Sequence, residues 1–434
     1  MFKRIKNINL KRIIEYSFYL FAFFFPLQTK LIIKSGDSNY NEIALFANYL
    51  LLAIIFILFL IYKIKNKKEE GVSTGLDKHW VILATIEFFI FLSIFVSIST
   101  DLSIFRYILF LLSIAMMFMM LNFKFDFKKI ILFFLAGLLL QAVLGIGQVF
   151  TQKTFSCKYL GIACHDVTEL GTSVIETINE RFLRAYGATD HPNIFGALMF
   201  FAVFLSIMII VKNNYHGTRR LLAYLSLFVF FIALWVSFSR SALLATGISL
   251  LFLLVAFYLE SKKLFMKYLP IFILLILLSG VLTILFKPIM IVRMETNSRL
   301  EKISINERQE QIATASTIIK KYPWLGVGLG AYHDKLLVLD SNLASYEAQP
   351  VHNTFILIWA EIGLWGLMFF IYLLFYLLKR NIKKLYYFPL FIGLLIFMLF
   401  DHWLWSLPWS YLFLFFILAL TFYLKQDNSF ENWK

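Results

Sequence analysis

Long apolar segments separated by short polar ones run through almost the whole chain. A helix that crosses a bilayer needs about 20 apolar residues, and this criterion predicts twelve membrane spans. In chain order they are residues 13–33, 43–61, 80–98, 104–121, 130–150, 194–211, 221–236, 241–259, 268–286, 354–378, 386–400 and 407–424. The first span contains Pro26 but no small-residue cleavage site, so we interpret it as an anchor and not as a signal peptide. The pattern predicts an all-α polytopic membrane protein.

The composition excludes most other classes of protein. Of the 434 residues, 60% are hydrophobic and only 15% are charged, against about 25% charged residues in a soluble domain. These values rule out a soluble enzyme, a disordered chain and a secreted disulfide-rich scaffold. In a soluble protein, the net charge of +15 would suggest a nucleic-acid partner. Here basic cytoplasmic loops explain the charge, and we expect no nucleic-acid partner.

The distribution of lysine and arginine orients the chain across the membrane. Basic residues fill the N-terminal segment and the connections that follow the even-numbered spans, whereas the short connections on the other side are nearly free of them. The positive-inside rule therefore places both termini in the cytoplasm. The two longest connections, residues 151–193 and 287–353, fall on the outer side. Long loops on a tight helical bundle are where chemistry usually takes place.

This pattern divides the chain into three regions. Residues 1–129 contain the first four spans, residues 130–378 form a core with the two long loops, and residues 379–434 contain the last spans and a cytoplasmic tail. No P-loop, dinucleotide-binding fingerprint, zinc-ligand spacing or internal repeat is present. We therefore expect no cofactor and no metal. The energy that drives any reaction must therefore come from the membrane or from a bond within the substrate.

Two sets of side chains predict local structural contacts. The only cysteines, Cys157 and Cys164, lie in the first long loop. In an oxidising outer compartment they fit a small disulfide loop, and the alternative is two free thiols. Gln141, Gly145 and Gln148 share one face of the fifth predicted span. This polar stripe predicts contacts between helices.

Two arginines stand where the positive-inside bias would not put them. Arg240 lies in a very short outer connection at the membrane boundary. Either it snorkels to a lipid phosphate, or it is a fixed cation that holds a phosphate-bearing ligand. Arg184 precedes a segment that leads through His191, Pro192 and Asn193 into the sixth span. The start of that helix offers free N–H groups to an anion, and we expect His191 to cap it rather than to bind a metal.

A third arginine lies on a helix predicted in the second long loop. Residues 304–307 read as a capping box, and the helix should run to about residue 321, before Pro323. The apolar face predicted for this helix consists of Ile305, Ile312 and Ile319. Arg308 lies close to that face. It either snorkels past the isoleucines or points into an anionic site beneath the helix.

The second long loop ends on His352 and Asn353 at the outer membrane boundary. With a pKa near neutrality, a histidine there can act as a general base or orient a hydroxyl; the alternative is an interfacial histidine without a partner. Glu361 lies deeper in the tenth span, and we expect it to anchor the bundle by pairing with an arginine. Before this span, Gly326 and Gly328 suggest a close-packed turn.

The unusual polar residues therefore share one side of the membrane. Arg184, Arg240, Arg308 and His352 all fall at the outer surface. Several cations with one histidine and no acidic pair for a metal imply an anionic ligand, most simply a diphosphate, that is handled outside the cytoplasm.

Four segments of the chain follow the order and spacing of one family of membrane proteins. They are Arg184…Gly187…His191-Pro192-Asn193, Ser239-Arg240, Arg308…Pro323…Gly326-Val327-Gly328 and His352-Asn353…Glu361-Ile362-Gly363…Gly366. In these segments the sequence resembles the O-antigen ligase and O-antigen polymerase superfamily of bacterial envelope glycosyltransferases. The resemblance covers mainly residues 130–378, and the spans outside this range match only in hydropathy.

The resemblance implies a GT-C-like fold with about twelve transmembrane helices and two long periplasmic loops, in the bacterial inner membrane. It also implies a metal-independent, inverting glycosyltransferase whose active site faces the periplasm. The donor would be a glycan on undecaprenyl diphosphate, and the acceptor would be a sugar hydroxyl of a glycan or of lipid A-core. The membrane lipids are the remaining expected partners.

By the same resemblance, Arg184, Arg240 and His352 are catalytic, whereas Arg308, Asn353 and Asn193 bind substrate. We favour a ligase because the His352-Asn353 pair is intact and the chain is compact. The first alternative is a polymerase of O-antigen or capsule from the same superfamily. The second is a membrane transporter of anions or lipid-linked sugars, although polar groups clustered at one rim are not typical of a transporter.

Overall fold

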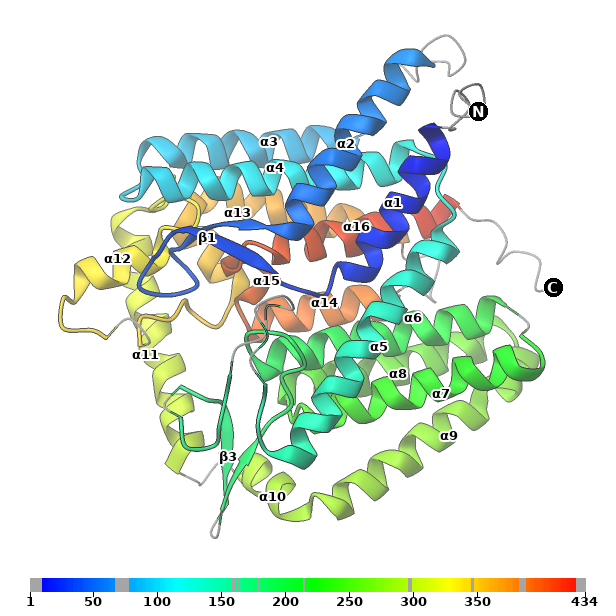
Figure 1. The fold of residues 1–434 in the computed structure, drawn as a ribbon. Coiled ribbons are helices and arrows are strands. Elements are labelled where there is room, and N and C mark those ends of the chain that lie inside the picture. The colour runs from blue at the N-terminus through cyan, green and yellow to red at the C-terminus, as the bar shows by residue number, and fades with distance from the viewer. Residues whose placement is uncertain are drawn as a thin grey trace.

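A computed structural model describes residues 10–66, 78–155, 157, 161, 164–169, 171–177, 180–213, 215–295, 299–344, 347–381 and 388–426. Within these residues the chain is mostly helical, with two small antiparallel hairpins (Figure 1). The helices are α1 (Leu10–Phe24), α2 (Ala47–Lys65), α3 (Lys78–Phe95), α4 (Thr100–Asn122), α5 (Phe127–Thr151), α6 (Pro192–Lys212), α7 (Gly217–Val236), α8 (Arg240–Glu260), α9 (Lys262–Leu285), α10 (Lys287–Glu295), α11 (Arg299–Lys321), α12 (Tyr332–Leu339), α13 (Thr354–Asn381), α14 (Phe388–Phe400), α15 (Trp403–Ser406) and α16 (Ser410–Gln426). The strands are β1 (Lys30–Lys34), β2 (Ile43–Phe46), β3 (Val174–Glu176) and β4 (Arg181–Leu183).

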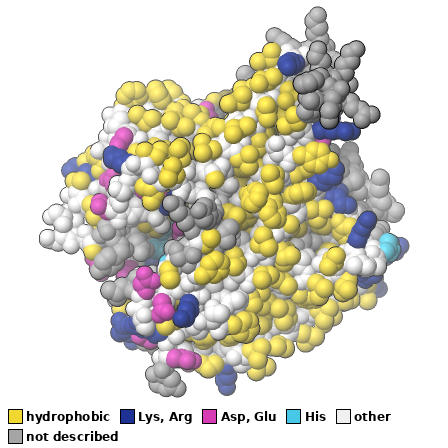
Figure 2. All heavy atoms as spheres, in the orientation of Figure 1, with side chains coloured by type: hydrophobic (Ala, Val, Ile, Leu, Met, Phe, Trp, Pro, Cys, Tyr) yellow, Lys and Arg dark blue, Asp and Glu magenta, His cyan; other side chains and the backbone are white. Residues whose placement is uncertain are grey.

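Nine of the described helices are long and apolar enough to cross a membrane, namely α2 to α9 and α13. Two shorter apolar helices, Phe388–Phe400 and Ser410–Phe422, accompany them. Figure 2 shows apolar side chains spread over the flank of the bundle. So much exposed apolar surface is unfavourable in water but suits contact with lipid tails. The chain is therefore a multi-pass membrane protein, as predicted.

The predicted count of twelve full-length spans is not confirmed by the described residues. The first predicted span divides at Pro26, where α1 has already ended at Phe24, and its second half becomes strand β1. Proline has no backbone N–H and disfavours the helical conformation in the residue before it. The second predicted span begins with strand β2, which pairs with β1. Two further predicted spans are the shorter helices α14 and α16.

Helix α6 lies at the centre of one half of the bundle, and its membrane-spanning segment is fully buried. It packs against α5, α7, α8 and α14. In the other half, α16 packs against α4, and α3 packs against α13. The helices α1 and α5 also pack together, so the three regions expected from the sequence contribute to one bundle.

The two ends of the bundle differ in chemistry. The start of α1 and the end of α16 lie at one end, and β1, β3, α11 and α12 lie at the other, which we call the loop end (Figure 1). On the face drawn in Figure 2, the acidic side chains gather mostly at the loop end. The opposite end carries lysine and arginine side chains with few acidic ones.

Helix α13 is broken at Gly363, whose backbone is left-handed with φ of 77°. The turn that precedes α12 lies against this break, because Val327 N–H donates to Ala360 O and Gly328 N–H donates to Glu361 O, both at 2.9 Å. The predicted close-packed turn is thus present. The buried Glu361 carboxylate accepts a hydrogen bond from Trp405 Nε1 at 2.9 Å, where an arginine was expected.

The predicted disulfide is not formed, because both Cys157 and Cys164 are free. An isolated bridge joins Lys153 to Asp166, and the Cys164 thiol lies 3.8 Å from Thr154 O. These contacts hold Cys164 against the residues that directly follow α5, and not against the other cysteine.

Candidate active site

The loop before α6 is held by two glutamines of α5. Gln148 Oε1 accepts hydrogen bonds from the N–H groups of Tyr186 and Gly187, each at 2.9 Å. Gln141 Oε1 accepts one from Ala188 N–H at 2.6 Å. Gly187 has φ of +59°, and a Cβ there would lie 2.7 Å from Gln141 Oε1, so glycine is required. Two residues of the predicted polar stripe, Gln141 and Gln148, therefore bind this loop and not another helix. They fix the backbone that directly follows Arg184.

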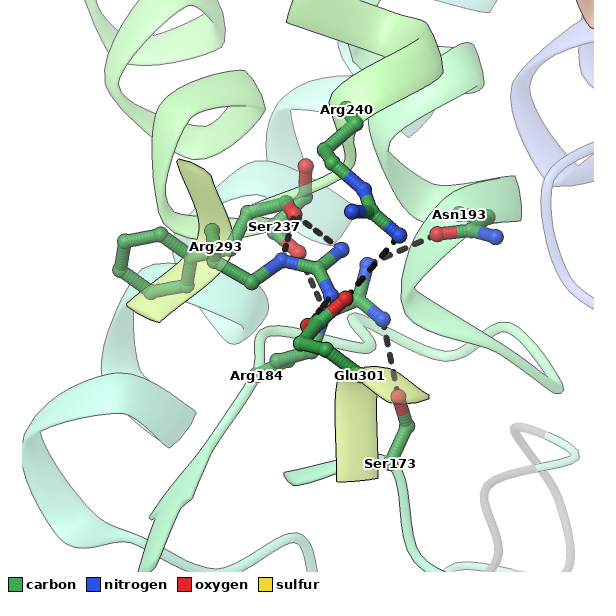
Figure 3. A network of polar contacts seen from close by, with 8 residues as sticks. Ser173, Arg184, Asn193, Ser237, Arg240, Arg293 and Glu301 are labelled. Carbon is green, nitrogen blue, oxygen red and sulfur yellow. Dashed lines mark hydrogen bonds and ion pairs between the residues drawn. The ribbon is translucent and has the colours of Figure 1, made fainter. Parts of the chain in front are cut away.

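Arg184 is buried and spreads its hydrogen bonds over three elements (Figure 3). Its Nε donates to Ser237 O at 2.9 Å, one terminal nitrogen donates to Ser173 Oγ at 2.9 Å, and the other donates to Asn193 Oδ1 at 2.7 Å. All three acceptors are neutral. Burial, and then the nearby Arg293, lowers the pKa of this guanidinium well below its ordinary value. An anionic ligand would stabilise the charge at this position.

A strained turn between α7 and α8 places two more arginines. Phe238 has a left-handed φ of 49°, a conformation that residues with a Cβ rarely adopt outside functional sites. Ser239 caps α8 by accepting a hydrogen bond from Ala242 N–H, which makes Arg240 the first residue of that helix. The carbonyl oxygen of Phe238 accepts hydrogen bonds from Arg293 Nε at 3.3 Å and from a terminal nitrogen of Arg293 at 3.0 Å.

Arg240 and Arg293 pair with Glu301 of α11, and Arg184 lies beside them (Figure 3). Arg240 lies 3.0 Å from one carboxylate oxygen of Glu301, and Arg293 pairs with the other. We call these four residues the arginine cluster. It carries three guanidinium groups and one carboxylate, so its net charge suits an added anion. Arg240 is the most accessible member, with 37% of its side chain exposed.

Sequence reasoning missed Arg293 and Glu301. Arg293 lies on α10 and Glu301 in the first turn of α11, which begins at Arg299 and not at the predicted residue 304. A carboxylate in the first turn stabilises a helix, and Glu301 was a better marker of the start of α11 than the capping box. The predicted end of α11 at Lys321 is correct.

Arg308 faces the bundle, on the same side of α11 as Glu301. The buried residues of α11 are Glu301, Ala315 and Ile318, whereas Ile312 is half exposed. The predicted apolar face therefore turns only in part toward the bundle: Ile319 packs against the core, whereas Ile312 points outward. Arg308 Nε is buried and has no hydrogen-bond partner in the described part of the chain. Burial lowers the pKa of Arg308 and the nearby Asp401 raises it, which favours the anionic-site interpretation over snorkelling.

His352 is held by α11 as well. Its Nδ1 lies 2.7 Å from Gln311 Oε1, an acceptor, so Nδ1 carries the proton and Nε2 keeps its lone pair. Burial lowers the pKa of His352 below 6.5; Asp401 opposes this shift and Arg308 adds to it. The imidazole is therefore neutral near neutral pH, which is the form that a general base needs.

Asp401 and His402 stand beside His352, and we call the three residues the histidine cluster. The rings of His352 and His402 meet edge to face, with their centroids 4.9 Å apart. His402 Nδ1 lies 2.7 Å from Ser406 Oγ. Burial alone would raise the pKa of Asp401, but the imidazoles of His402, His352 and His191 and the backbone N–H of His402 hold it below its usual range. The carboxylate is thus ionised.

Asn193 joins the two clusters. Its Oδ1 accepts from Arg184, and its Nδ2 donates to Asp401 Oδ2 at 3.1 Å. His191 caps α6 by accepting a hydrogen bond from Asn193 N–H at 3.1 Å, as predicted. Asn353 connects the start of α13 to the end of α14. Its Oδ1 accepts from Ile356 N–H at the start of α13, and its Nδ2 donates to Leu399 O.

Sequence reasoning also missed Asp401 and His402, which follow α14 and lie outside the predicted core region. Together with His352 they have the composition of a metal-ligand set, and their ligand atoms lie within 4.8 Å of one another. The positive charge of Arg308 acts on all three residues. This charge offsets that of the Asp401 carboxylate, so the cluster has little net negative charge to attract a cation.

Comparison with known proteins finds one matching family. Residues 225–371 match the family model described as O-antigen ligase. Over this segment, the predicted resemblance to the O-antigen ligase and polymerase superfamily is confirmed. The matched segment contains Arg240, Arg293, Glu301, Arg308 and His352, whereas Arg184, Asn193 and the Asp401-His402 pair lie outside it. No curated protein matches the chain.

Proposed function

We propose that this protein is a glycosyltransferase of the O-antigen ligase type. It transfers a glycan from undecaprenyl diphosphate to a sugar hydroxyl of an acceptor such as lipid A-core. The family match supports lipid-linked glycan substrates in a membrane. The observation that carries the proposal is Asn193, because this one side chain hydrogen-bonds to Arg184 of the arginine cluster and to Asp401 of the histidine cluster. A diphosphate site and a base site are thereby held together.

In this proposal, Arg184, Arg240 and Arg293 bind the diphosphate of the donor. The acceptor oxygen attacks the anomeric carbon while the bond from that carbon to the diphosphate oxygen breaks. The electron pair leaves with the diphosphate, and the configuration inverts. Preorganised guanidinium groups stabilise the charge that develops on the leaving group. Arg308, whose Nε is unpaired, lies between the two clusters and assists them.

His352 takes the proton of the acceptor hydroxyl on its free Nε2. Gln311 fixes the tautomer through Nδ1, and Asp401 stabilises the imidazolium that forms. Asp401 and Asn193 do not touch the reacting atoms in this scheme and act as positioning residues. General base catalysis of this kind contributes about 10²–10⁴-fold in rate.

We propose further that the loop end faces the periplasm and that the other end, with both termini, faces the cytoplasm of the bacterial inner membrane. The separation of basic from acidic side chains in Figure 2 supports this orientation, because cytoplasmic ends are rich in lysine and arginine.

The test is a gel of surface glycans from a strain that lacks this protein. The strain is complemented with the wild type, with His352→Ala or with His216→Ala. His216 is exposed at the start of α7, on the other side of the bundle, and serves as the matched control. We expect full-length polymer on lipid A-core with the wild type and the control. With His352→Ala, the core should carry no polymer, and long polymer should accumulate on undecaprenyl diphosphate.

Two other outcomes have defined meanings. Core with a single repeat unit in the deletion strain would overturn the ligase assignment and identify a polymerase of the same family. An unchanged ladder in the deletion strain would overturn both and favour a transporter.

A further inference from the structure

A pocket lined by both apolar and polar side chains lies near the histidine cluster. It has a volume of about 440 Å³ and is walled by the β1–β2 hairpin, the loop before α6 and the segment between α15 and α16. This volume is in the range of sites for small molecules, about 300–1,000 Å³. We call it the hairpin pocket. None of the residues predicted from the sequence to bind substrate lines it.

The polar groups of the hairpin pocket suit hydroxyl groups and do not suit phosphate. Two carboxylates, Asp190 and Glu42, and two amides, Gln28 and Asn39, line it. Lys30 forms an ion pair with Glu42. Asp190 is then the remaining acidic group of the pocket; burial raises its pKa, and the nearby Lys30 opposes this shift. Carboxylates accept hydrogen bonds from hydroxyls but repel a diphosphate. The diphosphate belongs to the arginine cluster, and this pocket fits an uncharged saccharide.

Two side chains indicate that a ligand completes this pocket. The side chain of Gln28 is 94% buried, with 6% of the residue exposed, and its Nε2 has no hydrogen-bond partner in the described part of the chain. A buried donor without a partner is unfavourable by about 1–3 kcal/mol, and a sugar oxygen could accept its hydrogen bond. Asp190 lines the cavity, and its side chain is exposed there.

Three chain connections link the hairpin pocket to the histidine cluster. Asp190 directly precedes His191, the cap of α6. Asn39 directly precedes Tyr40, whose ring lies 5.7 Å from the ring of His402. Trp409 follows α15, which ends at Ser406, the partner of His402 Nδ1. The hairpin pocket therefore lies beside the part of the histidine cluster that contains His402.

We infer that the hairpin pocket is the acceptor subsite, which holds an uncharged saccharide of the acceptor through Asp190, Glu42, Asn39 and Gln28. This inference rests on the proposed transfer reaction and adds the place of its second substrate. The rim of the pocket supports an acceptor that is anchored in the membrane. Leu31 and Ile32 line it and are 62% and 51% exposed, and such apolar side chains suit lipid contact.

The test is steady-state transfer by the purified full-length protein. The donor is undecaprenyl diphosphate-linked glycan, and the acceptor is the core glycolipid extracted from the deletion strain. The variants are Asp190→Asn and Gln28→Leu, with Asp37→Asn as the control. Asp37 is an exposed carboxylate of the same hairpin region and does not line the pocket. Binding of undecaprenyl diphosphate alone is measured separately for each protein.

We expect Asp190→Asn to raise the KM for the acceptor about 10-fold, as for the loss of a hydrogen bond to a charged group. The KM for the donor and the binding of undecaprenyl diphosphate should stay unchanged. Gln28→Leu should raise the acceptor KM without lowering the melting temperature, since it removes an unpaired buried amide. A purely structural role for Gln28 would change the melting temperature instead.

The failures of the two proposals are distinguishable. If the wild type transfers glycan but neither variant raises the acceptor KM, the subsite is wrong and the proposed function stands. A rise in the donor KM alone would assign the pocket to the donor glycan and also overturn the inference. If the wild type does not transfer glycan to the glycolipid, the proposed function itself fails.

Discussion

Asn193 Nδ2 donates a hydrogen bond to Asp401 Oδ2 at 3.1 Å, across 208 residues of sequence. The same amide accepts a hydrogen bond from Arg184 through Oδ1 at 2.7 Å. An amide is suited to this position because it offers one acceptor and one donor at the same time. A carboxylate could accept from the arginine but could not donate to Asp401, and an aliphatic side chain could do neither.

The first prediction concerns this amide. Asn193→Asp should lower kcat for glycan transfer about 10²-fold or more, because it sets a second carboxylate against Asp401 and disturbs the proposed base. The measurement is kcat and donor KM in detergent, with Asn213→Asp at the other end of α6 as the control. A higher donor KM with an unchanged kcat would contradict the positioning role of Asn193.

The second prediction concerns Arg293, which the sequence did not single out. Arg293→Ala should lower transfer about 10²–10³-fold, as for removal of one group that stabilises a leaving anion. Arg299→Ala is the matched control, since Arg299 is nearby on α11 but exposed and pairs with Glu176. Equal effects of the two substitutions on transfer, at equal protein levels, would argue against a specific role for Arg293.

The third prediction uses Glu301, which occupies the centre of the arginine cluster. This carboxylate pairs with Arg240 and Arg293 and therefore competes with an incoming diphosphate for the same groups. Glu301→Gln should bind undecaprenyl diphosphate more tightly and melt at a lower temperature without ligand, because buried guanidinium groups lose their counter-charge. Binding by titration and melting with and without undecaprenyl diphosphate test this. Weaker binding would show that Glu301 supports the site.

Much of the candidate site could be predicted because its chemistry is unusual for its place in the chain. Arg184, Arg240 and Arg308 contradict the positive-inside bias, and each lies in or beside the two clusters. The helix start at His191 and Pro192 followed from local rules, since capping depends on neighbouring residues. The lysine pattern and the apolar runs sufficed for a polytopic helical protein.

The rest depends on contacts between distant parts of the chain. Asp401 and His402 follow an apolar helix and carry no local signal, and only the packing of α14 against α6 and α13 brings them to His352. The sequence predicts the ends of two spans where the hairpin of β1 and β2 lies, because Leu31, Ile32 and Ile33 are as apolar as a membrane helix. Apolar content does not separate a strand from a helix over such a short run.

The fourth prediction concerns stability and the break in α13. Gly363→Ala should sharply lower the yield and melting temperature of the protein. A Cβ at Gly363 would lie 1.9 Å from Trp324 O, and its φ of 77° is itself unfavourable for alanine by about 1–2 kcal/mol. Gly280→Ala in α9 is the control, because nothing lies within 4 Å of a Cβ built there. Similar melting temperatures for the two variants would show that the break in α13 is not required.

The fifth prediction is the pH dependence of kcat. A general base works in its neutral form, and burial lowers the pKa of His352 below 6.5, so kcat should be level near neutral pH and fall only in more acidic solution. Arg308 lowers this pKa further, whereas Asp401 raises it. At saturating substrate, Arg308→Gln should therefore move the acid limb of the profile to higher pH, and Asp401→Asn should move it to lower pH. His216→Ala should leave the profile unchanged. Shifts of both variants in the same direction, or a wild-type limb above 6.5, would exclude His352 as the titrating base.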